Sequence, residues 1–172
     1  SIAVATGAFD SRGPEILRQT INDLSGDGPC RLLGSKSSAS LPQAAMMNTA
    51  LIRYLDYMDA VILPDETPHP SDNIGAALAA AEYRGCSGKE LITAIGIAYE
   101  IQIALSEVAP VRPHGGDHSY VVHGSTAAVS KLLGLDQKQT THALSIATAS
   151  SNPLRVTRDG DISMWKGVAS AN

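Results

Sequence analysis

Acidic residues and a histidine gather in one twenty-residue stretch, YLDYMDAVILPDETPHPSDN over residues 54–73, although only 17% of the chain is charged. Asp56 and Asp59 stand three residues apart, which places both carboxylates on one side of the end of a predicted helix. The helix dipole disfavours anions at a C-terminus, so these carboxylates need a cation, and Arg53 stands one turn earlier. The stretch indicates either a local Arg–Asp pair on a solvated helix end or part of a charged site.

Two histidines have sequence neighbours that restrict their positions. His69 stands between Pro68 and Pro70, and prolines fix φ and bias the preceding residue toward extended backbone. A histidine held in this way suits proton transfer, although a surface position in the loop before Ser71 is the alternative. His118 is predicted to lie at a helix N-terminus, where the dipole lowers the pKa of an imidazole and favours a neutral base.

The stretch HGGDHSYVVH, residues 114–123, contains three histidines and one aspartate that could bind a metal. The two glycines interrupt any helix between His114 and His118, and His118 and His123 do not share a helix face. No HExxH motif and no cysteine partner accompany them. We therefore predict no metal centre.

Cations gather near the end of the chain, at Arg155, Arg158 and Lys166. Arginine suits bidentate binding of carboxylates. Lys166 follows Trp165 in a predicted helix of small residues. A basic surface strip is the alternative. Together, the acids, histidines and cations would suit removal of a proton next to a carboxylate. The cations would stabilise the enolate-like charge, and a histidine would protonate a departing hydroxyl.

The elements that must position these side chains are predicted to be helices. Local signals place them at about residues 14–24, 42–59, 73–83, 88–106, 118–133 and 136–150, with a further helix at the end of the chain. Helix boundaries are marked by Pro42, by capping boxes at Ser87–Glu90 and Asp136–Gln139, and by Gly134. CRLL at residues 30–33 is a short extended candidate. The pattern predicts an all-α, multi-helix array around one core, with residues 1–172 as a single helical domain.

Composition excludes several classes of protein. Hydrophobic residues make up 44% of the chain and aromatics only 4%, so the core must consist of Ala, Leu, Ile and Val. A net charge of −4 argues against nucleic acid as the main partner. Cys30 and Cys86 are too few for a disulfide framework, and we expect reduced thiols in a cytoplasmic protein.

No apolar run approaches the roughly 20 residues of a membrane span, so no membrane is predicted. The apolar opening has no basic region typical of a signal peptide and no initiator Met. Because the last residues read as helix without a stop signal, we expect the chain to be a fragment of a longer, two-domain protein.

Three motifs resemble those of the MmgE/PrpD family, which includes 2-methylcitrate dehydratase and cis-aconitate decarboxylase. They are RYLDYMDA followed by HPSDN, then DHSYVVHGSTAAVSKLLGLDQKQTTHALSIA, and LRVTRDGDISMWKG. The resemblance covers nearly the whole chain. It implies a large all-α domain, a smaller α+β lid that is absent from this chain, and a homodimer. The missing lid, or a second chain that supplies it, is therefore an expected partner.

The resemblance also implies roles for individual residues. By similarity Asp56, His69, His118 and Lys166 are the catalytic candidates, and Arg53, Asp59, Ser71 and Arg155 are the candidates for substrate binding. His118 or Asp56 would remove the proton, and His69 would assist the leaving hydroxyl. Two departures from the family pattern are Ala60, where Thr or Ser is common, and the absence of a counterpart to a lysine of the lid.

The HPSDN and SMWKG motifs favour the 2-methylcitrate dehydratase branch. The implied reaction is cofactor-free elimination of water from a tricarboxylate such as 2-methylcitrate or citrate. Two cysteines could not supply the three or four thiolates of an iron–sulfur cluster. The alternatives are a decarboxylase of cis-aconitate, an amino-acid epimerase of the same family, or a non-catalytic helical module that pairs with a partner chain.

Overall fold

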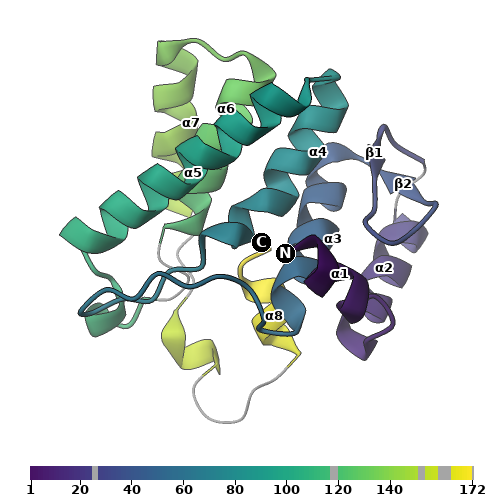
Figure 1. Ribbon diagram of the computed structural model, residues 1–172, viewed down its shortest axis with the longest axis horizontal. Coiled ribbons are helices and arrows are strands. Elements are labelled where there is room, and N and C mark those ends of the chain that lie inside the picture. Colours follow the sequence, from purple (N-terminus) through teal and green to yellow (C-terminus); the bar gives the residue numbers. More distant parts are fainter. Residues whose placement is uncertain (25–26, 117–119, 151–153, 159–163, 172) are drawn as a thin grey trace.

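Nearly all of the regular structure is helical, which confirms the predicted fold class (Figure 1). The computed structural model describes residues 1–24, 27–116, 120–150, 154–158 and 164–171, without the side chains of residues 157, 158, 165 and 166. Within these ranges the α-helices are α1 Ile2–Ala8, α2 Arg12–Leu24, α3 Leu41–Tyr54, α4 Ile74–Arg84, α5 Gly88–Val108, α6 Val121–Leu133, α7 Gln137–Ser150 and α8 Trp165–Ala169.

Short elements complete the described part of the chain. The 3-10 helices are η1 Pro70–Asn73, η2 Arg112–His114 and η3 Arg155–Arg158. Strands β1 Cys30–Arg31 and β2 Ser38–Ala39 pair antiparallel, with Cys30 opposite Ala39. The sequence anticipated an extended segment at Cys30 but neither its pairing nor the α1 helix.

Several helix boundaries lie where local signals predict them. Ser87 and Glu90 form the reciprocal capping box that begins α5. Asp136 and Gln139 exchange hydrogen bonds of the same kind, 2.8 and 3.0 Å long, at the start of α7. Gly134 ends α6 with a φ of 74°, a conformation that glycine adopts without steric cost. These predictions are confirmed.

Two predicted boundaries differ from the structure by more than two residues. The helix that we expected to reach residue 59 ends at Tyr54, because Asp56 adopts a left-handed φ of 59° that an α-helix cannot accommodate. The N–H of Asp56 instead bonds to the carbonyl of Arg53 at 3.2 Å. Asp56 and Asp59 therefore lie in a loop, not on a helix side. The helix predicted over 118–133 begins at Val121 among the described residues, and its predicted first residue, His118, lies outside them.

Helix α4 lies at the centre of the array, between α3 on one side and α5 and α6 on the other (Figure 1). Helices α1, α2 and α8 pack against α3, and α7 packs against α6. Small side chains fill the space between α4, α5 and α6, as the low aromatic content predicts. The buried residues of this cluster are Ala77, Ala80, Ala81, Ala94, Ala98, Ala128 and Leu132.

A glycine sets the closest approach of α3 and α4. A Cβ atom at Gly75 would lie 2.8 Å from the Cα of Thr49 and would collide with the Thr49 backbone nitrogen. We expect Gly75→Ala to lower the free energy of unfolding by about 1–3 kcal/mol, because the two backbones must separate. Gly96→Ala on α5 is the matched control, since nothing lies within 4 Å of its Cβ position and alanine favours helix. Thermal denaturation of both variants measures the difference; equal melting temperatures would contradict this packing.

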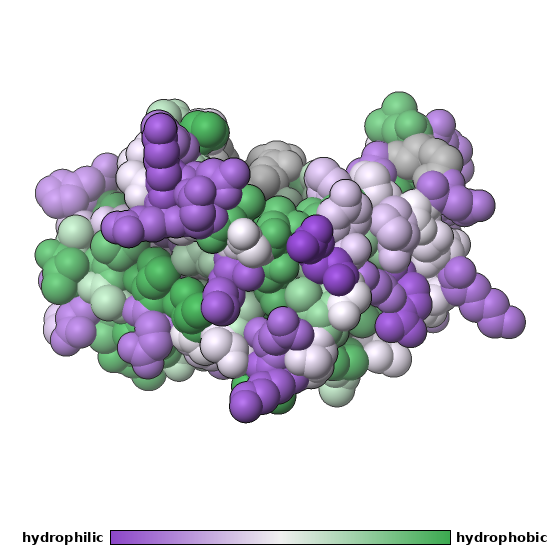
Figure 2. All heavy atoms as spheres, turned by 90° about the horizontal axis from the view of Figure 1, so that it is seen from above, coloured by the Kyte–Doolittle hydropathy of each residue, from purple (hydrophilic) through white to green (hydrophobic). Residues whose placement is uncertain are grey.

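Helix α5 has an apolar surface. It is long and apolar enough to cross a membrane by length and composition, contrary to the sequence-based expectation, and only 22% of its most apolar window is buried inside the molecule. A single helix of this kind is weak evidence for a membrane span, because length and composition are the only criteria that it meets. Ile92 and Val108 of α5 are 71% and 76% exposed, and Ile146 of α7 is 68% exposed. Figure 2 shows apolar surface on its left half, at the end where Figure 1 places α5, α6 and α7.

Candidate active site

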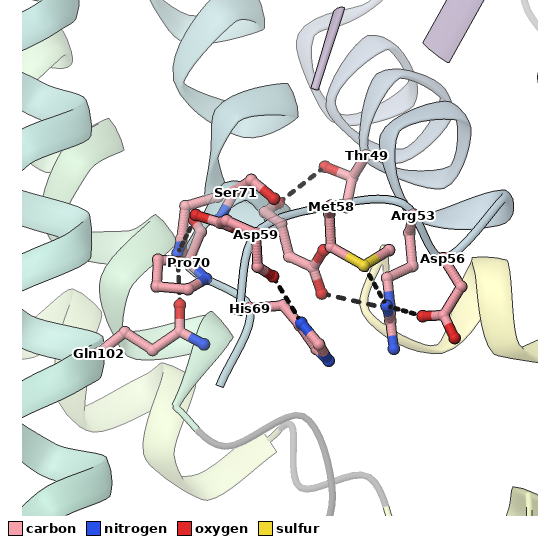
Figure 3. Close-up of polar contacts among 11 residues, drawn as sticks. Thr49, Arg53, Asp56, Met58, Asp59, His69, Pro70, Ser71 and Gln102 are labelled. Atoms are coloured by element: carbon pink, nitrogen blue, oxygen red, sulfur yellow. Dashed lines mark hydrogen bonds and ion pairs between the residues drawn. The ribbon is translucent and has the colours of Figure 1, made fainter. Parts of the chain in front are cut away.

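Arg53 is a buried cation at the last turn of α3, with 1% of its side chain exposed. Its Nη1 donates to Oδ1 of Asp56 at 2.7 Å and contacts Sδ of Met58 at 2.8 Å (Figure 3). Its Nε lies 3.5 Å from Oδ2 of Asp72, which is fully buried. A buried guanidinium remains charged and requires such anions. The Arg–Asp pair inferred from the sequence is therefore confirmed.

Asp56 projects from an unusual backbone conformation. Among the described residues, Asp56 and Tyr120 are the only ones other than glycine that have a positive φ. Such conformations cost about 1–3 kcal/mol and gather at functional sites, where the surrounding structure maintains them. The bond to Arg53 holds the Asp56 carboxylate, which remains 44% exposed. Asp56 can therefore face both the buried cation and a ligand.

The loop between α3 and η1 is folded back on itself. The N–H of Val61 bonds to the carbonyl of Pro68, and the N–H of Leu63 bonds to that of Glu66, both at 3.0 Å. Glu66 is 3% exposed. Its Oε1 accepts hydrogen bonds at 2.6 and 2.7 Å from the backbone nitrogens of Val111 and Arg112. This carboxylate therefore ties the loop that carries His69 to the loop after α5, a role that no sequence signal indicated.

The His69 ring is held in one tautomer. Its Nδ1 lies 2.7 Å from the backbone carbonyl oxygen of Asp59, which only accepts hydrogen bonds (Figure 3). Nδ1 therefore carries the proton and Nε2 has a free lone pair. Burial is the largest effect and lowers the pKa of His69, while the contact with the Asp59 carbonyl raises it by less. The Arg53 charge lowers this pKa, and the Asp56 and Asp59 carboxylates raise it by smaller amounts. At neutral pH, His69 is thus a neutral imidazole that can accept a proton at Nε2.

Asp59 joins the loop to η1 and α5. Its Oδ1 accepts a hydrogen bond from the backbone nitrogen of Ser71 at 3.0 Å. The hydroxyl of Tyr99 on α5 donates to the Asp59 carboxylate, and burial together with this bond raises the pKa of Tyr99. The hydroxyl of Ser71 is buried and has no hydrogen-bond partner among the described residues. Tyr99 is a candidate site residue that sequence reasoning missed, because one tyrosine in an apolar helix has no distinguishing pattern.

The HPSDN motif also has a structural role. Nδ2 of Asn73 donates to Oε1 of Gln102 at 2.6 Å and to the carbonyl of Pro70 at 2.9 Å (Figure 3). Its Oδ1 accepts from the hydroxyl of Ser125 at 2.8 Å. Asn73 and Gln102 are both buried. This satisfied polar network connects η1 to α5 and α6, and it fixes the end of the loop from which His69 projects.

Asp72 has a strongly perturbed carboxyl group. Burial raises its pKa to about 7, outweighing the Arg53 charge and a hydrogen bond from Ser170, which both lower it. The more exposed Asp56 carboxylate lies closer to the guanidinium, so Asp72 can carry a proton without leaving Arg53 unpaired. Asp72 therefore titrates near neutral pH at the back of the site.

The raised pKa of Asp72 predicts a pH-dependent stability. Between about pH 4 and pH 7 the folded protein retains a proton that the unfolded chain has released, so stability falls as pH rises through this window. Asp72→Asn removes this contribution, which is on the order of 4 kcal/mol. We expect the wild-type protein to lose more unfolding free energy than the variant between pH 5 and pH 8. Urea titrations at both pH values test this, and parallel changes in the two proteins would contradict it.

The structure brings some of the predicted site residues together and does not describe others. Arg53, Asp56, Asp59, His69 and Ser71 come together around the end of α3. Arg53 and Ser71 are 1% and 0% exposed, so both are buried at the base of this cluster, and their predicted roles in substrate binding remain predictions. His118 lies outside the described residues, as does the side chain of Lys166, whose backbone belongs to α8.

Arg155 lies on a segment that reaches the second histidine loop. Its backbone nitrogen bonds to the carbonyl of Gly115 at 2.9 Å, and Leu154 pairs with Gly116 in a bridge. The chain around Arg155 is thereby placed beside residues that lead toward His118. The described residues contain no group of three or more His, Cys, Asp or Glu side chains that could hold a metal ion.

Comparison with known proteins connects this arrangement to a family. The sequence matches the MmgE/PrpD N-terminal domain over residues 1–172. It is 37% identical over 146 residues to the alkylcitrate dehydratase phiI of a fungal species, an alignment that covers 76% of this chain and 29% of that protein.

Two further relatives have related names. The chain is 36% identical over 142 residues to a probable 2-methylcitrate dehydratase of Saccharomyces cerevisiae, with 74% of the chain and 27% of that protein covered. It is 34% identical over 139 residues to a 2-methylcitrate dehydratase of Escherichia coli K12, with 74% and 29% covered. The chain spans less than a third of the length of these curated relatives. It belongs to the MmgE/PrpD family and matches the N-terminal domain of that family.

Proposed function

We propose that the protein containing this chain is a hydro-lyase that eliminates water from a tricarboxylate, with 2-methylcitrate as the first candidate and citrate as the second. The neutral His69, with its free Nε2 beside the Asp56–Arg53 pair, is the observation that carries the proposal. Dehydration of a hydroxy acid needs a base for the proton next to a carboxylate, an acid for the leaving hydroxyl and cations for the carboxylates. The names of the dehydratase relatives support the same reaction class.

The tautomer of His69 favours one assignment of base. In the proposed step Nε2 of His69 takes the proton from the carbon next to a carboxylate, and the electrons of that C–H bond form the alkene as the C–O bond breaks. The departing hydroxyl takes a proton from a second group and leaves as water. The role first inferred for His69, protonation of the hydroxyl, requires an imidazolium, which burial disfavours. His118, which the sequence favoured as the base, then takes the acid role in this proposal.

The remaining groups are proposed to bind the substrate and to stabilise the negative charge that develops on it. Arg155 and Lys166 are the proposed partners of the substrate carboxylates and of the enolate-like charge that develops as the proton leaves. Asp56 is placed to accept a hydrogen bond from the substrate, with Arg53 compensating its charge from behind. Every proposed step is acid–base chemistry of side chains in this chain, without a cofactor.

A substrate assay tests the proposal. The whole protein is incubated with 2-methylcitrate and with citrate, and alkene formation is followed by ultraviolet absorbance and by chromatography of the products. We expect turnover of at least one substrate, with 2-methylcitrate preferred. Absence of turnover with both would overturn the proposal. Release of carbon dioxide from cis-aconitate in a parallel reaction would instead support a decarboxylase.

A further inference from the structure

The loop between α3 and η1, residues 55–69, has two arms that are bonded to each other. Figure 1 shows this loop reaching from the end of α3 to the segment that follows α5. Three hydrogen bonds join its arms, from His69 to Asp59 at the base, from Val61 to Pro68, and from Leu63 to Glu66 at the tip. Because all three bonds lie within the loop, they shape it without fixing its tip to the rest of the molecule.

Glu66 attaches the tip of this loop to another part of the chain. Among residues 61–67, all of which the structure describes, Glu66 is the one buried residue, at 3% exposed, whereas Ile62 is 87% exposed. Oε1 of Glu66 accepts hydrogen bonds at 2.6 and 2.7 Å from the backbone nitrogens of Val111 and Arg112. A buried carboxylate requires such donors, and its hydrogen bonds are stronger than those between neutral groups. The side chain of Glu66 therefore holds the tip against the loop after α5.

The loop that receives this carboxylate, residues 109–116, is itself held from two directions. The hydroxyl of Tyr120, the residue before α6, donates to the carbonyl of Ala109 at 2.6 Å. The backbone nitrogen of Arg155 donates to the carbonyl of Gly115 at 2.9 Å. The receiving loop is thus tied both to the start of α6 and to the segment that carries a candidate substrate-binding arginine.

We propose that Glu66 is a positioning residue that sets the place of His69 relative to Arg155. The inference rests on the proposed function, in which His69 removes a proton and Arg155 binds a substrate carboxylate. His69 lies three residues after Glu66 on the returning arm, so a displacement of the tip is transmitted to the imidazole. A misplacement of about 1 Å at a reacting group can cost on the order of 10²-fold in rate. Glu66 itself is buried, and it acts through His69 and not on the substrate.

Hydrogen exchange measures this attachment without reference to activity. In the whole protein, Glu66→Ala is expected to increase amide exchange at least about fivefold in peptides that cover residues 55–63 and 109–116. Glu66→Gln should change it little, because the amide oxygen can accept the same two bonds. Glu82→Ala on α4 is the matched control, since Glu82 also accepts from a distant backbone nitrogen, that of Arg31, at 2.7 Å. Unchanged exchange in both peptides of Glu66→Ala would overturn the proposal.

Steady-state kinetics separate the reach of the Glu66 side chain from its charge. Glu66→Gln keeps the length and loses the charge, whereas Glu66→Asp keeps the charge and is one methylene shorter. We expect Glu66→Gln to stay within about threefold of the wild-type kcat, and Glu66→Asp and Glu66→Ala to lower kcat about tenfold or more. Glu82→Ala should leave kcat unchanged. A more active aspartate variant than glutamine variant would overturn the proposal, because charge and not position would then matter.

A second background tests whether Glu66 acts through His69. In His69→Gln, the further change Glu66→Ala should lower kcat no more, because the base that Glu66 positions is already gone. An equal loss in both backgrounds would indicate a general structural role and would overturn the proposal. Absence of wild-type turnover would instead refute the proposed function, while hydrogen exchange would still decide whether Glu66 joins the two loops.

Discussion

Replacing His69 by glutamine is expected to lower kcat for 2-methylcitrate by at least about 10²-fold in the whole protein. Glutamine can preserve a hydrogen bond to the Asp59 carbonyl, but it has no basic lone pair with which to accept the substrate proton. Steady-state kinetics measure the effect. The matched control is His142→Gln, which alters an exposed histidine on α7 and should leave kcat unchanged. A loss of only a few-fold for His69→Gln would remove this residue from the proton-transfer step.

The pH profile of the wild-type protein provides a second test of the role of His69 as the base. The base must be neutral, so kcat/KM should fall on the acid side as His69 becomes protonated. Burial lowers the pKa of His69 below its ordinary value of 6.5, so the half-maximal rate should lie below pH 6.5. An acid-side inflection above that value would contradict the burial argument. The inflection should also change or disappear in His69→Gln, in whatever activity remains.

Replacing Arg53 by methionine is expected to lower the free energy of unfolding by about 3–5 kcal/mol at pH 8, because it leaves a buried carboxylate at Asp72 without its cation. Methionine retains much of the apolar stem, so the loss comes mainly from the charge. Urea denaturation followed by circular dichroism measures it. The control is Arg84→Met in the last turn of α4, where an exposed cation contributes about 1 kcal/mol or less.

Two additional measurements show whether Asp72 is the source of this loss. At pH 5 the Arg53→Met variant should recover part of its stability, because Asp72 can then take a proton. Adding Asp72→Asn to Arg53→Met should also recover part of the loss at pH 8, because no buried charge remains at that position. If neither change helps, the destabilisation comes from lost packing around Arg53 and not from an unpaired carboxylate.

The sequence predicted those features that depend on neighbours along the chain. The α5 and α7 capping boxes, Gly134 as a helix end and the Arg53–Asp56 pair all involve residues within four positions of one another. The alanine-rich core also followed from composition, since few aromatic residues were present to fill it. The family motifs also predicted which segments surround the candidate site.

Other features required the tertiary structure, because they arise between residues that are distant in sequence. No local pattern shows that Asp72, next to Ser71 in a loop motif, is buried against Arg53 of α3 and that its pKa is raised to about 7. Nor does any local pattern show that the hydroxyl of Tyr99, on α5, interacts with the carboxylate of Asp59 in the loop after α3.

The end of α3 was placed wrongly for the same reason. Helical periodicity continues through Asp56 in the sequence, whereas the buried Arg53 guanidinium holds the Asp56 carboxylate where the chain turns into a left-handed conformation. The amino-acid sequence by itself thus determined most of the helices, the small-residue core and the types of chemical group available. Only the tertiary structure decided which of them are desolvated and paired. Hydrogen-bond partners and burial are properties of positions in space: the Asp59 carbonyl sets the tautomer of His69, and burial sets the proton on Asp72.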